Sequence, residues 1–115
     1  MKNLWLLAVL MMATASFAQA AHSVQITWTE SDTTSGITYK TYRGSAACSA
    51  SPTMTVLTSG ITTLTSTDST VTLGNSYCYY ITATAPGLLE SAPSNSVTAN
   101  VNKAAPPVIT ITIAQ

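Results

Sequence analysis

The sequence predicts an all-β fold, an antiparallel β-sandwich, and three observations support this prediction. Only 7% of the 115 residues are charged, while Thr, Ser and β-branched residues are abundant, a composition that favours strands over helices. Several short segments alternate apolar and polar residues, which is typical of a strand with one buried face. Clusters of Gly, Pro, Asn and Ser separate these segments, and no stretch shows helical periodicity.

The first twenty residues are predicted to be a secretory signal peptide and are set aside from the fold. Lys2 gives a positive start, residues 4–12 are apolar, and Ala18-Gln19-Ala20 forms a cleavage site of small residues. The apolar run is shorter than the ~20 residues of a bilayer span, so no membrane span is expected. Cleavage after Ala20 removes twenty of 115 residues and leaves 95, which predicts one secreted domain, extracellular or periplasmic.

The first half of the mature chain contains four predicted strands. Residues 24–29 alternate strictly, which places Val24, Ile26 and Trp28 on one buried face. After a loop at 30–36, further strands are expected at 37–43, at 54–57 with an end at Ser59-Gly60, and, more weakly, at 61–67.

The second half contains the clearest strand, residues 77–83, which follows the turn Gly74-Asn75. A period of two directs Tyr77, Tyr79, Ile81 and Ala83 inward and Cys78, Tyr80 and Thr82 outward. A loop with Pro and Gly at 85–93 leads to a sixth strand at 96–101. Residues 21–101 are therefore predicted to form the domain.

Cys48 and Cys78 are the two cysteines of the chain. Because a secreted chain folds in an oxidising compartment, a single disulfide between them is expected, with a reactive thiol pair as the alternative. Two cysteines and one histidine do not complete a four-ligand zinc site without carboxylates.

Four segments, in order and at fitting intervals, together resemble a fibronectin type III domain in its short bacterial form. They are HSVQITWT at 22–29, YKTYRG at 39–44, residues 74–83, and ESAPSN at 90–95. The resemblance implies an immunoglobulin-like sandwich in which Trp28 is the core tryptophan. It also implies that Tyr77 is the tyrosine-corner residue, whose hydroxyl bonds back to the chain entering its strand.

The resemblance also implies where the two cysteines lie, and the sequence differs from the family pattern at two points. It places Cys48 and Cys78 at one pole of neighbouring strands, where they can meet on the outer face of a sheet. Ser66, or its neighbour Leu64, stands where the family usually buries a larger residue. The family's first strand is missing, because only three mature residues precede the strand at 24–29.

No catalytic or metal-binding pattern is found in the sequence, so we expect no enzyme activity and no cofactor. His22, the one histidine, lies at the start of the mature chain and cannot complete a serine triad alone. A calcium site needs about six oxygen ligands close together, whereas the acidic residues lie in separate predicted loops: Glu30, Asp32, Asp68 and Glu90. A nearly neutral chain also lacks the basic patch of a nucleic-acid-binding protein.

Tyr42 and Tyr80 are predicted to point outward from neighbouring strands of one sheet. Such a pair is suited to contact with a protein or a carbohydrate. Ordinary cross-strand packing is the alternative.

The chain ends on an additional predicted strand, residues 108–114, after a linker at 102–107. Val108 and the alternating Ile109, Ile111 and Ile113 form an uncharged strand, which in isolation would associate with other strands. Three interpretations stay open. The strand folds back on its own molecule, beside either 96–101 or 24–29; it is donated to the empty first-strand position of the next copy; or it begins a further domain of a longer array.

These features predict a secreted, non-catalytic structural or adhesive module that contacts a protein or cell-surface partner. Two alternatives are a filament subunit that self-associates by exchange of its C-terminal strand, and a carbohydrate-binding accessory module that uses Tyr42 and Tyr80.

Overall fold

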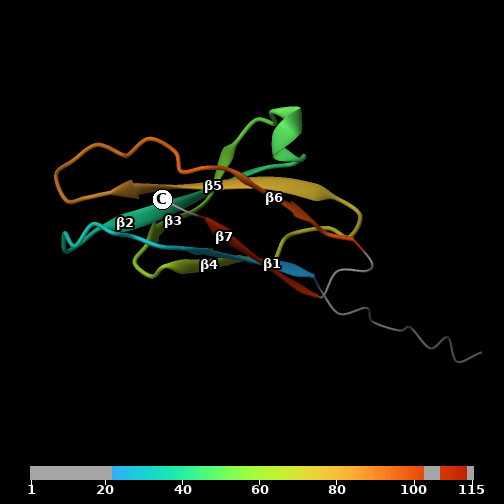
Figure 1. Cartoon of the computed structure of the whole chain (residues 1–115), viewed down its shortest axis with the longest axis horizontal. Helices are drawn as coiled ribbons and strands as arrows, with labels where there is room; N and C mark the ends of the chain where they lie inside the picture. The colour runs from blue at the N-terminus through green and yellow to red at the C-terminus, as the bar shows by residue number, and fades with distance from the viewer. Residues whose placement is uncertain (1–21, 103–106, 114–115) are drawn as a thin grey trace, which may run out of the picture.

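Two β-sheets pack face to face as a sandwich in the computed structural model, which describes residues 22–102 and 107–113 (Figure 1). One sheet has three strands in the order β4-β1-β7, and the other has four in the order β3-β2-β5-β6. The prediction of an all-β sandwich is confirmed. The strands are β1 (Ser23–Trp28), β2 (Thr38–Gly44), β3 (Thr55–Ile61), β4 (Thr65–Asp68), β5 (Ser76–Thr84), β6 (Val97–Asn100) and β7 (Val108–Ile113).

Several predicted features lie outside the described residues: the signal peptide at 1–20, the central part of the linker at 102–107, and the last residue of the strand at 108–114. Within the described part of the chain the one helix is a single 3-10 turn, η1 (Cys48–Ala50). No helix there is long and apolar enough to cross a membrane.

The core lies between the two sheets and follows the period-two alternation of the strands. Val24, Ile26 and Trp28 of β1 are buried, as predicted, and face Tyr79 and Ile81 of β5 across the sandwich. Strand alternation places every second side chain on the same face, so each strand contributes its apolar residues to one layer. The other buried residues of the core are Tyr39, Tyr77, Ala99, Val101, Ile111 and Ile113.

The outer face of β5 is covered by loops, which the alternation alone did not indicate. Cys78 and Thr82 are outside the core cluster, as predicted, yet they are 3% and 4% exposed. The η1 turn is tied over Cys78 by a disulfide from Cys48. The loop after β5 covers Thr82, whose hydroxyl donates a hydrogen bond to Glu90.

The predicted end of β3 at Ser59-Gly60 is wrong, because the strand continues to Ile61. Its pairing with β2 shifts register twice, and Gly60 has a φ of +67°. A bulge with glycine in the left-handed region lets a strand pass through such a residue and continue. The next strand, β4, therefore starts at Thr65 instead of residue 61.

β7 folds back beside β1 of its own chain, but the expectation of a wholly antiparallel sandwich is wrong at this pair. The two strands run parallel, from Ser23 opposite Val108 to Trp28 opposite Ile113, and lie side by side in Figure 1. The chain leaves β6 at the end of the sandwich where β1 also begins, as the hydrogen bond from the Ser23 amide to the Pro107 carbonyl shows. Since both strands start from that end, they point the same way.

Candidate functional site

Tyr42 and Tyr80 lie directly opposite each other on β2 and β5, on the outer face of the four-stranded sheet. Their rings stack with centroids 4.8 Å apart and planes 28° apart. Both side chains are half-buried. The predicted pair is therefore together in space, but each ring directs one face at the other.

Glu90, in the loop between β5 and β6, holds this pair in place. Its carboxylate accepts hydrogen bonds from the hydroxyls of Tyr42 and Thr82, and Lys40 lies 3.7 Å from its other oxygen. The hydrogen bonds from Thr82 and Tyr42 lower the pKa of Glu90, and the same Glu90 contact raises the pKa of the Tyr42 hydroxyl. The carboxylate thus connects the loop to two strands.

The predicted disulfide is confirmed: Cys48 and Cys78, separated by 30 positions in sequence, are bonded, with Cα atoms 4.8 Å apart. The Cys48 amide also donates a hydrogen bond to the Thr98 hydroxyl at 3.0 Å. A disulfide is consistent with an oxidising compartment. The bond fixes η1 over the outer face of β5.

Trp28 and Tyr77 both lie in the core. Trp28 is 3% exposed and packs its ring against Tyr39, with centroids 5.3 Å apart. Its indole nitrogen has no hydrogen-bond partner among the described residues. The Tyr77 hydroxyl accepts a hydrogen bond from the amide of Thr72, five residues upstream, at 2.9 Å.

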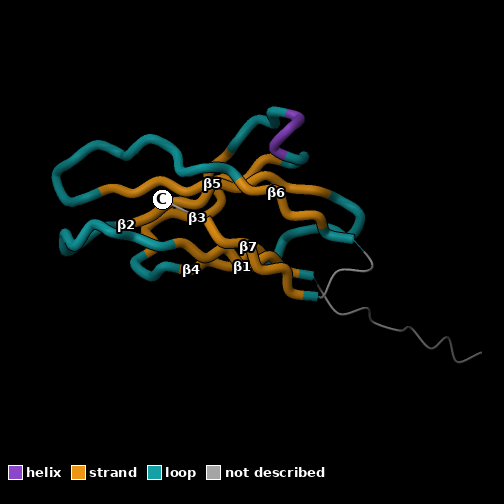
Figure 2. Tube along the Cα trace, viewed as in Figure 1, coloured by secondary structure: helices purple, strands orange, loops and turns teal. Residues whose placement is uncertain are grey.

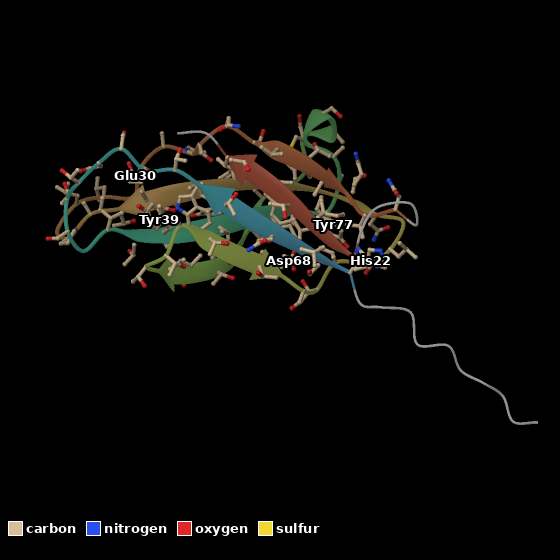
Figure 3. All side chains as sticks on the ribbon, turned by 60° about the horizontal axis from the view of Figure 1, so that its bottom comes forward. His22, Glu30, Tyr39, Asp68 and Tyr77 are labelled. Carbon is tan, nitrogen blue, oxygen red and sulfur yellow. A yellow bond between two sulfur atoms is a disulfide. The ribbon has the colours of Figure 1, made fainter. Side chains whose placement is uncertain are left out.

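A buried polar cluster around Asp68 was not predicted from the sequence, which assigned this residue to a loop. The Asp68 carboxylate accepts hydrogen bonds from the Tyr79 hydroxyl at 2.7 Å and from Arg43 at 2.9 Å. The amide and the hydroxyl of Thr70 both donate hydrogen bonds to the second oxygen of this carboxylate. The guanidinium of Arg43 also lies over the Tyr77 ring, 5.2 Å from its centroid. Figure 3 shows Asp68 and Tyr77 toward the end of the sandwich that carries His22.

The charge state of Asp68 follows from these contacts. Burial alone would raise the pKa of its carboxyl, but hydrogen bonds from Thr70, Tyr79 and Arg43 outweigh burial and lower it. Burial and the Asp68 carboxylate raise the pKa of Tyr79 far above its ordinary value. Asp68 therefore stays ionised inside the sandwich, and the cluster is fully hydrogen-bonded, as a buried carboxylate requires.

A hollow of about 510 Å³ lies at the opposite end, between the loop that follows β1 and the loop that joins β5 to β6. Figure 2 shows these two loops extending from the same end of the sheets. The hollow is lined by the acidic Glu30 and Asp32, by Ala83, and by residues 91–95 of the second loop. Glu30 lies beside Tyr39 at this end in Figure 3.

A second, smaller hollow of about 190 Å³ shares Glu30 and Asp32 and extends to Leu88 and Leu89. These leucines are 68% and 93% exposed, the largest apolar exposures among the described residues. Among the described residues, Lys40 forms an ion pair with Glu90, and Arg43 forms one with Asp68. Neither cation forms an ion pair with Glu30 or Asp32. We call this surface, formed by Glu30, Asp32, Leu88 and Leu89, the loop-end surface.

Sequence reasoning missed the loop-end surface because its two halves are more than fifty residues apart in the chain. The one local signal is a Leu-Leu pair directly after the turn residues Pro86-Gly87, where a loop usually carries polar side chains.

The residues predicted to form a donor strand lie in β7. Ile111 and Ile113 face the core and are 7% and 0% exposed, Ile109 is half-buried, and Val108 is exposed. In this structure they complete the sheet of their own chain.

Among residues 22–102 and 107–113 no group of three or more His, Cys, Asp or Glu side chains is arranged to hold a metal ion. Comparison with known proteins finds no family model and no curated protein that matches this chain.

Proposed function

We propose that this protein is a secreted, non-catalytic contact module of fibronectin type III type, which binds an extracellular protein partner through the loop-end surface. The observation that carries the proposal is the exposure of Leu88 and Leu89 beside the hollow that contains Glu30 and Asp32. The strand segments quoted above support the fibronectin type III assignment.

Leu88 and Leu89 form the apolar part of the loop-end surface. Leu89 is 93% exposed. When a partner buries such a side chain fully, the burial contributes about 1.5–3 kcal/mol to the free energy of binding. The part of the loop that follows the leucines is attached to β5 by two hydrogen bonds. The Ser91 hydroxyl accepts one from the Ala83 amide, and the Ser94 hydroxyl accepts one from the Ile81 amide. A loop fixed in this way presents the leucines with a small loss of entropy on binding.

Glu30 and Asp32 form the charged part of the loop-end surface. Hydrogen bonds from Thr34 lower the pKa of Asp32, which keeps its carboxylate charged in mildly acidic surroundings. A partner would complement the whole loop-end surface if it placed a basic side chain near the two carboxylates and an apolar side chain against the two leucines. The partner is therefore a protein segment with adjacent basic and apolar residues.

A carbohydrate platform at Tyr42 and Tyr80 is less well supported. Each ring uses one face on the other, and the Tyr42 hydroxyl is bonded to Glu90. Sugar rings bind on exposed aromatic faces, so this geometry favours cross-strand packing.

The proposal is tested by measuring how much of the labelled predicted mature chain, residues 21–115, is retained on the surface of the cells that secrete it. Replacing Leu88→Ser together with Leu89→Ser should reduce retention at least tenfold, because both apolar contacts are lost. Val56→Ser is the matched control, since Val56 is an apolar side chain that is 51% exposed on β3 and belongs to neither loop; it should leave retention unchanged.

Treatment of the surface before the assay identifies the class of partner. Protease digestion should abolish retention, and periodate oxidation of glycans should not. Retention that survives protease but is lost after periodate and in Tyr80→Ala would support the carbohydrate-binding alternative and contradict the proposal.

A further inference from the structure

The four sheet edges of this sandwich differ in how they are protected against pairing with another strand. Edge strands β4 and β6 have four residues each, and β3 is interrupted by register shifts and Gly60. Short length and bulges are two common ways to prevent edge-to-edge association. β7 is different: six residues, regular pairing with β1 on one side, and no described strand on the other.

The composition of β7 also leaves its open edge unprotected. Its sequence, VITITI, contains no charged residue and no proline. Natural edge strands usually carry a lysine or a proline that opposes pairing, and neither is present here. The two described cations are both engaged elsewhere, with Glu90 and Asp68.

The hydrogen bond from the Ser23 amide to the Pro107 carbonyl shows which backbone groups of β7 face outward. In a parallel pair, alternate residues direct both of their backbone groups toward the neighbouring strand. Since Ser23 lies opposite Val108 and bonds to Pro107, the groups of 107, 109, 111 and 113 face β1. The amides and carbonyls of Val108, Thr110 and Thr112 therefore face away from the sheet.

We propose that this open edge binds the β7 edge of a second copy of the chain, antiparallel and without exchange of strands. The two three-stranded sheets then form one six-stranded sheet through a two-fold axis. In an antiparallel pair, opposite residues that face each other exchange both hydrogen bonds.

The outward groups determine the register of this pair. If Thr110 faces Thr110 of the second copy, Val108 faces Thr112 and all three outward residues form hydrogen bonds. A shift of two residues, with Ile111 at the axis, places Val108 opposite residue 114, outside the described strand. The register centred on Thr110 therefore uses every outward donor and acceptor of β7 as described, residues 108–113.

A second copy is the occupant that the edge itself favours. In the register centred on Thr110, every facing pair is β-branched: Val108 faces Thr112 and Thr110 faces Thr110 on the outer face, and Ile109 faces Ile111 on the inner face. β-Branched cross-strand pairs stabilise antiparallel sheets. The low charge of the chain leaves little repulsion between copies.

The register is tested with the predicted mature chain carrying Thr110→Cys, kept under mild oxidation. Two facing cysteines at the axis have Cα atoms about 5.5 Å apart, which is within the range of a disulfide. We expect most of the chain to run as a disulfide-linked dimer on a non-reducing gel, joined through residue 110 by mass spectrometry. Thr112→Cys, on the same strand and the same face, would face Val108 and should stay monomeric.

The association itself is tested by light scattering on the unmodified chain and on Thr110→Pro. Proline removes only the outward amide, so β7 can keep its ladder with β1, and the edge position tolerates it. We expect the unmodified chain to approach twice its monomer mass as concentration rises and Thr110→Pro to stay at monomer mass, both with the same near-ultraviolet spectrum.

Two results would overturn the proposal. One is a monomer at every concentration together with no cross-link in Thr110→Cys. The other is equal cross-linking of Thr110→Cys and Thr112→Cys, which would show random collision in place of a fixed register.

Discussion

Asp68 illustrates how a single residue sets the polarity of this core. Its strand, β4, contributes no large apolar side chain: Ser66 is half-buried, and Asp68 is the one fully buried residue of the strand. In place of a large apolar side chain, the strand contributes a charge cluster of Asp68 with Arg43 and Tyr79. A carboxylate buried in this way stabilises the fold only while every partner is present.

Replacing Asp68→Asn should lower the free energy of unfolding by about 3 kcal/mol at pH 7, because it leaves Arg43 without its counter-ion. The folded-state pKa of Asp68 is lowered, so its contribution is present above the ordinary aspartate pKa, about 4, and is lost as pH falls below it. Denaturant unfolding of both chains between pH 7 and pH 2.5 should show the difference shrinking with acid.

Asp32→Asn is the control for this comparison, since Asp32 is fully exposed in its loop. It should change stability little at any pH. A constant difference between the Asp68→Asn and unmodified chains across the acid range would contradict an ionised Asp68.

Among the elements, strand alternation was predicted well where one face is strictly apolar, as in β1 and β5. The end of β3 was missed because a bulge allows a strand to run through Gly60, which composition alone marks as a turn. The pairing direction of β7 depends on where the chain leaves β6, and no residue within β7 encodes it. Tyr42 and Tyr80 could be placed together because they lie on neighbouring strands, whereas the loop-end surface requires two distant loops to converge.

β7 contributes to the core as fully as the strands of the main domain do. Ile113 is completely buried, and its partner Trp28 lies directly opposite on β1. Ile113→Ala should therefore lower the free energy of unfolding by about 3 kcal/mol, through lost burial and the cavity that remains.

Val108→Ala, on the same strand but exposed, serves as the control and should cost less than about 0.5 kcal/mol. Thermal or denaturant unfolding followed by tryptophan fluorescence would measure both. Equal, small effects at the two positions would mean that β7 does not pack on the core.

At the scale of the whole molecule, the C-terminal strand completes the sandwich of its own chain. The last strand, β7, occupies the edge beside β1. Closure within one chain needs only a short connection and therefore loses little loop entropy. One end of the closed sandwich presents the loop-end surface, and β7 has no further strand beside it among the described residues.

This closure is tested most directly by the double variant Thr27→Cys with Thr112→Cys. The two threonines lie opposite each other on β1 and β7, and their hydroxyl oxygens are 3.3 Å apart. Under mild oxidation we predict a disulfide within each chain, so that the protein runs as a monomer on a non-reducing gel and mass spectrometry joins residues 27 and 112 beside the intact Cys48–Cys78 bond. A ladder of covalently linked chains would show that β7 is donated to a neighbouring copy, and it would contradict closure within one chain.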